Sequence, residues 1–156
     1  MPESLDRAAI LEEACRIAAT QLGGTLATMH SEDGTPYVTF VLFHLRADGE
    51  LLFGSGAAPQ HSHNMVATPE VSFLIDNREV VRTDWAAFDR IVIEGHAEAV
   101  SADDSRFPAY IEELRAKNRM AAYFTERGKL FCIRPRRLIL MKGFEPTRNV
   151  VDWESE

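Results

Sequence analysis

The residues most able to do chemistry follow a short apolar run at 51–53 and combine small side chains with hydrogen-bond donors. Gly54-Ser55-Gly56 comes directly after the run, and Pro59 suits the first turn of a helix. A helix N-terminus has free backbone N–H groups and the positive end of the helix dipole, so it favours an anion such as a phosphate. Polar side chains surround this turn: Gln60, His61, Ser62, His63 and Asn64. The stretch therefore predicts a strand that leads into an anion-binding helix start.

Two other interpretations of this stretch stay open. Small residues between a strand and a helix often form only a turn. His61 and His63 could be surface residues or half of a zinc site, but the chain has no CxxC, HExxH or clustered carboxylate partner, so no metal site is predicted. The stretch is not a P-loop, because neither GxxxxGK(S/T) nor a helix-opening GxGxxG occurs.

Length and composition fit one globular domain. The chain has 156 residues, 46% of them hydrophobic and 26% charged, which is enough for a sizeable core. Its formal charge of −7 disfavours broad nucleic-acid binding, which needs a basic face. Two cysteines give no disulfide framework, and we see neither a signal peptide nor an apolar stretch of membrane-spanning length. A cytoplasmic protein is therefore expected.

The first half of the chain indicates a helix and then antiparallel strands. Ser4 can cap a helix that runs to Leu22 and ends at Gly23-Gly24. Strands are expected at 25–30 and 37–45, because Asp-Gly turns follow each of them. Both faces of 37–45 are mostly apolar, so both should be covered, one by a barrel interior and the other by a helix or a second subunit.

The next segments continue the antiparallel pattern around one irregular stretch. The helix that starts near Pro59 should stop at Thr68-Pro69, before a strand at 71–75. Residues 77–87 show no regular pattern and could form a loop over a pocket. Arg82 could meet a substrate anion there and Trp85 an aromatic ligand. The alternative, which we favour, is an ordinary hairpin loop with Trp85 anchored in the core.

The last third predicts a long strand, a helix and two closing strands. Residues 90–100 alternate clearly, with Gly95 at a bend or bulge. Ser101 or Ser105 can cap a helix that ends near Asn118, with one further helical turn at 120–125. Strands at 129–133 and 137–141, interrupted by Arg134-Pro135, lead into a tail at 144–156. The sum is an α+β chain built on an antiparallel barrel of six or seven strands, with flanking helices.

No catalytic nucleophile stands out. GxSxG is absent, neither cysteine has a nearby histidine, and the five histidines are scattered. Glu94 and His96 share a strand face, as exposed strand residues often do. A hydrolase is disfavoured, and the phosphate pocket fits a phosphorylated cofactor that would supply the chemistry while the protein orients it.

Taken together, the motifs resemble the pyridoxamine 5'-phosphate oxidase-like superfamily of FMN-binding split barrels. No single motif is decisive, but their order and spacing cover roughly residues 22 to 145. The stretches that carry the resemblance are 24–28, 34–39, Ser55, 61–65, 68–72, 90–95 and 138–144. The resemblance implies one FMN-binding split-barrel domain over 1–156, with an N-terminal helix at 1–22. It also implies a homodimer that holds the cofactor at its interface.

The resemblance implies particular cofactor contacts, with departures from the true oxidases. His61 matches a basic phosphate-binding position, and Arg90 matches the arginine that opens the RxxxEG strand. Thr39 and Gln60 replace arginines of the oxidases, Ile91 replaces a flavin-contacting glutamine, and the C-terminal Arg-Leu-x-Pro ending is absent, so oxidation of pyridoxamine phosphate is doubtful. The full set of implied cofactor contacts is Thr39, Ser55, Gln60, His61, Ser62, Asn64 and Arg90.

The leading hypothesis is an FMN-dependent oxidoreductase acting on a small molecule. Substrate contacts are expected from Arg82 and Trp85, or from the tail near Phe144 and Trp153. A second hypothesis is a non-enzymatic carrier, sensor or haem-utilisation protein, since relatives bind the deazaflavin coenzyme or haem instead of FMN. No C-terminal haem-ligating histidine is evident, because the last histidine is His96. A third hypothesis is a structural dimer without a ligand. No nucleic acid or membrane partner is expected.

Overall fold

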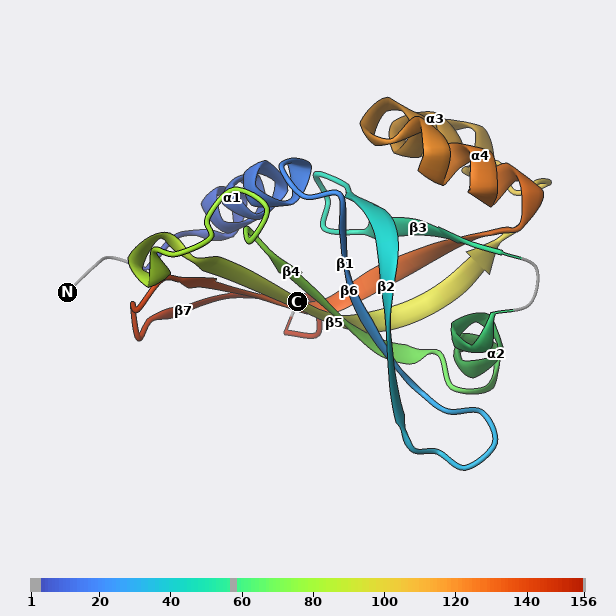
Figure 1. Ribbon diagram of the computed structural model, residues 1–156, viewed down its shortest axis with the longest axis horizontal. Helices are drawn as coiled ribbons and strands as arrows, with labels where there is room; N and C mark the ends of the chain where they lie inside the picture. The colour runs from blue at the N-terminus through green and yellow to red at the C-terminus, as the bar shows by residue number, and fades with distance from the viewer. Residues whose placement is uncertain (1–3, 57–58, 156) are drawn as a thin grey trace.

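The chain folds into a closed antiparallel barrel of six strands, extended by a seventh. The structure, a computed structural model, describes residues 4–56 and 59–155. Hydrogen bonding gives the strand order β3-β2-β1-β4-β5-β6-β7, and a further pairing of β3 with β6 closes the barrel. The α+β split barrel predicted from the sequence is confirmed (Figure 1). The strands are β1 (Gly23–Met29), β2 (Pro36–Leu45), β3 (Leu51–Ser55), β4 (Glu70–Asp76), β5 (Asp89–Val100), β6 (Lys129–Lys142) and β7 (Arg148–Asp152).

Four α-helices occur within the described ranges, and they flank the barrel. α1 (Arg7–Ala19) contacts β2, β4 and β7, whereas α2 (Gln60–Ala67) connects β3 to β4 and contacts β1, β2 and β5. α3 (Phe107–Lys117) and α4 (Arg119–Arg127) form a hairpin between β5 and β6. In Figure 1 this hairpin lies above the β3–β6 side of the barrel, whereas α2 lies beside the ends of the strands.

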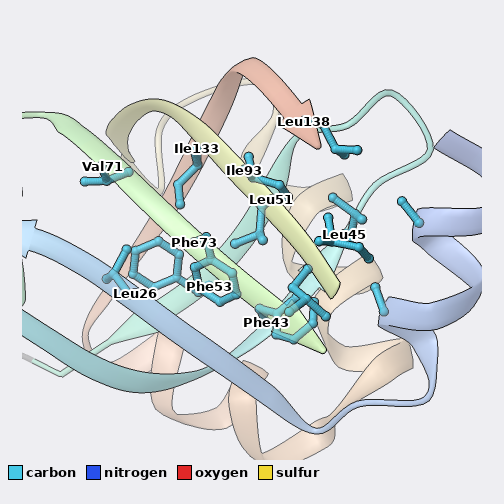
Figure 2. Packing of buried hydrophobic residues seen from close by; sticks show 14 of the residues in the cluster. Leu26, Phe43, Leu45, Leu51, Phe53, Val71, Phe73, Ile93, Ile133 and Leu138 are labelled. Atoms are coloured by element: carbon cyan, nitrogen blue, oxygen red, sulfur yellow. The ribbon is translucent and has the colours of Figure 1, made fainter. Parts of the chain in front are cut away.

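Apolar side chains from every barrel strand meet in the interior (Figure 2). Leu26, Phe43, Phe53 and Phe73 are inaccessible or nearly so, and the rings of Phe43 and Phe73 meet edge to face. One face of α1 closes this core through the predicted positions Ile10, Ala14, Ile17 and Ala18. Burial of alternate strand positions therefore explains both the barrel and the side on which α1 lies.

A second, smaller apolar cluster holds α3 and α4 against the outer barrel surface. Leu52 and Cys132 are neighbours on β3 and β6 and point away from the main core. Tyr110, Leu114 and Ala121 of the helical hairpin cover them. This cluster explains why β3 is buried on both faces.

The break expected at Arg134-Pro135 does not occur, because β6 is one continuous strand. The register with β5 shifts between Glu94 and Gly95, so that Glu94 pairs with Arg137 and Gly95 with Pro135. A bulge tolerates a proline, since the local ladder hydrogen bonds are already disrupted. The predicted irregularity at Gly95 is confirmed, and it is what accommodates Pro135.

Several predicted helix ends are wrong. Asp6, not Ser4, caps α1 by accepting from the backbone N–H of Ala9 at 2.8 Å. The helix ends at Ala19, and Gly23-Gly24 open β1 instead of terminating the helix. A side chain at Gly24 would collide with the Phe73 ring and with backbone of β4, which explains a glycine inside this strand.

Two C-terminal elements also differ from expectation. Neither Ser101 nor Ser105 caps α3, which follows Arg106 and carries a proline in its first turn. The further turn expected at 120–125 belongs to a full helix, α4, capped by Asn118 through the N–H groups of Met120 and Ala121. The tail expected after residue 144 contains β7, which pairs with β6 from Arg137 to Met141.

Two apolar regions are exposed within the single chain. Trp85 lies in a short 3₁₀ helix, η1 (Trp85–Ala87), with 57% of its surface exposed, so it is not anchored in the core. On the outer face of β2, Leu42 and His44 are half-buried, but Val38 and Phe40 are 64% and 61% exposed. Within one chain, therefore, only part of the outer β2 face is covered.

Candidate functional site

Two serine hydroxyls join the end of β3 to the first turn of α2. Ser55 Oγ and Ser62 Oγ lie within hydrogen-bonding distance of each other, and both side chains are buried. Ser55 also donates to the backbone oxygen of Gly56 at 3.3 Å. The strand and helix start predicted as an anion site therefore form one compact unit, which we call the β3–α2 cradle, comprising Ser55, Gly56 and 59–62.

His61 is the chemically distinctive member of the cradle. It is only 8% exposed, and its Nε2 is buried without a hydrogen-bond partner in the described part of the chain. Burial lowers the pKa of His61, so the imidazole is neutral near pH 7. A buried polar atom without a partner costs free energy, which a ligand atom can recover by bonding to it.

A cavity of about 250 Å³ adjoins the cradle. Its walls come from β2, from the end of β3 and from the start of α2, and α4 contributes Ala121 and Phe124. Phe40 connects the cavity to the exposed outer face of β2. The α4 residues were missed from the sequence, because 120–125 was expected to form only one helical turn. The cavity has the mixed apolar and polar lining that small ligands use.

Asn64 and Gln60 are brought to the cradle, but they tie it to the β1–β2 hairpin. Asn64 is fully buried; its Nδ2 donates to Thr28 Oγ1 at 2.9 Å, and its Oδ1 accepts from Ser31 N and Gln60 Nε2, both at 2.8 Å. Gln60 also donates to Ser31 Oγ at 3.2 Å. Because these bonds use the amide of Asn64, it positions α2 and has little capacity left for a ligand.

Thr39 and Arg90 lie outside the cradle. Thr39 is half-buried on β2 opposite Leu26, on the strand side that carries Val41 and Phe43, and it does not line the cavity. Arg90 lies at the first end of β5, whereas the cradle adjoins the other end, roughly 30 Å along the strand. Arg90 donates to the Gly143 carbonyl at 3.0 Å, and its Nε is buried without a partner among the described residues.

The predicted substrate contacts divide between two places. Arg82 and Trp85 line a cavity of about 580 Å³, and the Trp85 ring lies 6.4 Å from that of Phe144. Trp153 instead packs near the β2–β3 turn, with the Arg7 guanidinium 5.0 Å from its ring. The structure thus brings Arg82, Trp85 and Phe144 together and separates Trp153 from them.

The histidine pair of α2 splits between two environments, since His61 is buried and His63 is exposed. No group of three or more His, Cys, Asp or Glu side chains with metal-binding geometry is found across 4–56 and 59–155. In the same residues, no helix is long and apolar enough to cross a membrane.

Comparisons with known proteins identify the family. The family model described as pyridoxamine 5'-phosphate oxidase matches residues 11–140. The search of curated proteins found no match.

Solved structures share the fold at low identity. A haem-binding protein from Mycobacterium smegmatis is 24% identical with a TM-score of 0.79; the alignment covers 97% of this chain but only 61% of that one. HutZ, a haem storage protein from Vibrio cholerae, is 20% identical over 80% of this chain and 88% of its own, with a TM-score of 0.65. An FAD-binding protein from Mesorhizobium loti is 18% identical over 87% and 94%, with a TM-score of 0.66. With the family model matching most of its length, the chain belongs to the pyridoxamine 5'-phosphate oxidase family of split barrels.

Proposed function

We propose that residues 1–156 form one FMN-binding domain that acts as an FMN-dependent oxidoreductase on a small molecule. The observation that carries the proposal is the buried Nε2 of His61, in the first turn of α2, which has no hydrogen-bond partner among the residues that the structure describes. Ser55 and Ser62 add hydroxyl groups beside it. A phosphate bound here accepts hydrogen bonds from these groups and lies at the positive end of a helix dipole.

The roles of the chain in this proposal are binding and orientation. His61, Ser55 and Ser62 hold the FMN phosphate, while Asn64 and Gln60 fix α2 against the β1–β2 hairpin. FMN, when bound, supplies the reversible electron transfer. A neutral His61 binds the phosphate as a hydrogen-bond donor, and a bound dianion raises the pKa of the imidazole.

The proposal includes a homodimer with FMN at the interface. Exposed Val38 and Phe40 on β2 support it, because the family frequently dimerises and large apolar side chains in one exposed row favour a partner. Phe40 also lines the cavity beside the cradle, which connects that surface to the cofactor site. Arg90 is too far from the cradle within one chain and joins the site only from a second copy.

Haem binding is the second candidate. It is supported by the names of two solved relatives, the haem-binding protein of M. smegmatis and the haem storage protein HutZ. The two functions predict different chromophores, because flavin and haem absorb in distinct bands.

An absorbance spectrum of the purified protein, taken before and after adding FMN and removing the unbound fraction, tests both candidates. Flavin bands at about one FMN per chain support the proposal, and oxidation of NAD(P)H by the loaded protein supports the enzymatic part. A retained haem band with no flavin favours the second candidate. Retention of neither chromophore contradicts both.

His61→Ala tests the cradle directly, with His63→Ala as the matched control on the exposed side of the same helix. Loss of one hydrogen bond to a charged group costs about 1.5–3 kcal/mol, so the FMN Kd of His61→Ala should rise at least tenfold. The Kd of His63→Ala should not change. Equal affinities of wild type and His61→Ala would show that the phosphate lies elsewhere.

A further inference from the structure

The cavity of about 580 Å³ that contains Arg82 and Trp85 is formed by the loop that connects β4 to β5. We call it the β4–β5 cavity; its walls come from Arg78, Glu79, 81–85 and Phe88. In Figure 1 this loop and α2 lie at opposite ends of the view. The volume falls within the range of small-molecule sites. No residue lines both this cavity and the one beside the cradle, so it is separate from the proposed FMN site.

Hydrogen bonds fix the loop that forms the cavity. The buried side chain of Asn77 donates to the Ala87 carbonyl at 2.9 Å and accepts from Asp89 N at 3.0 Å, so it joins the start of the loop to its end. Glu79 Oε2 accepts from Leu22 N at 2.9 Å, which ties the loop to the segment between α1 and β1. The walls are therefore held in place before a ligand arrives, and this lowers the entropic cost of binding.

Trp85 gives the cavity an aromatic surface that water can reach. Its side chain is 57% exposed. The ring of Phe88 meets the indole edge to face with the centroids 4.8 Å apart, and Phe144, which is 74% exposed, lies on the same aromatic cluster. These neighbours hold the indole in one orientation although much of it is open to solvent. Exposed aromatic rings that are fixed in this way favour a ligand that has a ring of its own.

Arg82 is the cation of the cavity that no described residue pairs with. Across 4–56 and 59–155, its guanidinium has neither an ion pair within 4.0 Å nor a hydrogen bond. Arg78, the other arginine of the wall, is bound to Asp76, to which its Nε donates at 2.7 Å. A guanidinium carries five N–H donors in a planar fork that matches a carboxylate. Arg82 is therefore available to an anionic group of a ligand.

Two carboxylates also line the cavity, but both accept from the backbone. Glu79 accepts the Leu22 N–H, and Asp84 Oδ1 accepts from Ala86 N at 3.0 Å, where it caps η1. By contrast, the Thr83 hydroxyl and the indole N–H of Trp85 form no hydrogen bond within the described part of the chain. The unused polar groups of the cavity can therefore donate hydrogen bonds, which favours a ligand that accepts them.

We propose that the β4–β5 cavity binds small planar aromatic molecules that carry a carboxylate. The ring of the ligand lies against the indole of Trp85, and the carboxylate accepts hydrogen bonds from the Arg82 guanidinium, with the Thr83 hydroxyl beside it. No covalent bond forms or breaks. The proposal does not rest on the proposed function, because neither FMN nor the cradle takes part in this binding.

Isothermal titration calorimetry with indole-3-acetate tests the proposal on the intact protein without added FMN. Indole-3-acetamide has the same ring but no charge, and tryptamine carries the opposite charge. Indole-3-acetate should bind with a Kd below about 1 mM and at least fivefold more tightly than the amide. Equal affinities for the acid and the amide, tighter binding of tryptamine, or no detectable binding of the acid would overturn the proposal.

Two substitutions at exposed positions locate the bound acid. Arg82→Gln removes the charge, so the preference for the acid over the amide should disappear. Arg119→Gln is the matched control, since Arg119 is an exposed arginine outside the cavity that also has no ion pair among the described residues; the preference should stay. Trp85→Ala should weaken binding of both the acid and the amide at least fivefold. An unchanged preference in Arg82→Gln, or an unchanged affinity in Trp85→Ala, would show that the acid binds elsewhere.

Discussion

The side-chain amide of Asn64 donates to the hydroxyl of Thr28 at 2.9 Å, and solvent reaches neither side chain appreciably. Through this bond α2 is fastened to the β1–β2 hairpin. Asn64→Ala leaves both Thr28 and the Ser31 N–H without this partner, so the free energy of unfolding should fall by about 2–3 kcal/mol. Urea denaturation measures the change. Gln60→Ala removes the two outer bonds of the network, to Asn64 Oδ1 and to Ser31 Oγ, and should cost less than about 1 kcal/mol.

Glu13 links two cations at the edge of α1, and this makes stability depend on pH. Its hydrogen bond to Arg16 is the largest effect; burial opposes it, Lys142 reinforces it, and together they lower the pKa of Glu13 to about 2. The lowered folded-state pKa means that Glu13 stabilises the fold above about pH 4.5 and loses this contribution as pH falls towards 2.

Glu13→Gln should therefore reduce the free energy of unfolding by about 1–2 kcal/mol at pH 7. The difference from wild type should shrink below pH 4.5 and vanish near pH 2. Urea titrations between pH 2 and 7 measure it. Glu12→Gln, at an exposed neighbour, is the control and should change stability by less than about 0.5 kcal/mol at every pH. A pH-independent effect of Glu13→Gln would rule out the ion-pair explanation.

Gly95 lies against the backbone of β6 at the bulge. A Cβ at Gly95 would lie 2.3 Å from the backbone oxygen of Arg134, which cannot move without disturbing the ladder. Gly95→Ala should lower stability by at least about 2 kcal/mol in thermal or urea unfolding. At Gly56 no atom of the described residues lies within 4 Å of an added Cβ, so Gly56→Ala should be nearly neutral. If both substitutions lower stability by similar amounts, the loss at Gly95 is due to the reduced flexibility of the backbone and not to the contact of the new Cβ with Arg134.

The proposed dimer can be tested at the outer face of β2. Val38→Glu places a charge in the exposed apolar row, and burying an unpaired charge at an interface costs several kcal/mol. Sedimentation velocity should show a monomer for this variant and a dimer for wild type. Val80→Glu alters a residue with the same 64% exposure in the loop between β4 and η1, outside the barrel strands, and should stay dimeric. A dimeric Val38→Glu would place the interface elsewhere.

Strand positions followed from the sequence because alternation and turn residues are local signals. The Asp-Gly turns placed β1, β2 and β3 within two residues of their ends. The order of the strands in the barrel could not be predicted from local patterns, because β3 pairs with β6 and β1 pairs with β4, which are far apart in the chain. The resemblance to a family supplied what the local pattern could not.

The errors have a common physical origin in tertiary contacts. Gly23-Gly24 have the composition of a helix end, yet they lie in β1 because the rings of Phe40 and Phe73 leave no room for a side chain. Pro135 looked like a strand break, and only the register shift in β5 makes it compatible with β6. When one strand compensates for an irregularity in another, neither segment shows this in its own sequence.

The candidate site was predicted in part. The turn chemistry of 54–64 correctly placed Ser55, His61 and Ser62 together. The same pattern could not show that the Asn64 side chain forms hydrogen bonds with Thr28 and Ser31, because β2 and β3 lie between these residues and Asn64 in the chain.

Closing the barrel through β3 and β6 has a consequence for how the protein is made. The two strands pair although two strands and three α-helices lie between them in the chain. Ordering so much intervening chain before the pairing forms makes folding slow. During synthesis, β3, which contains the apolar residues Leu51, Leu52 and Phe53, therefore has one unpaired strand edge until β6 leaves the ribosome. We expect this interval to be the period when the nascent chain is most prone to aggregate and most dependent on chaperones.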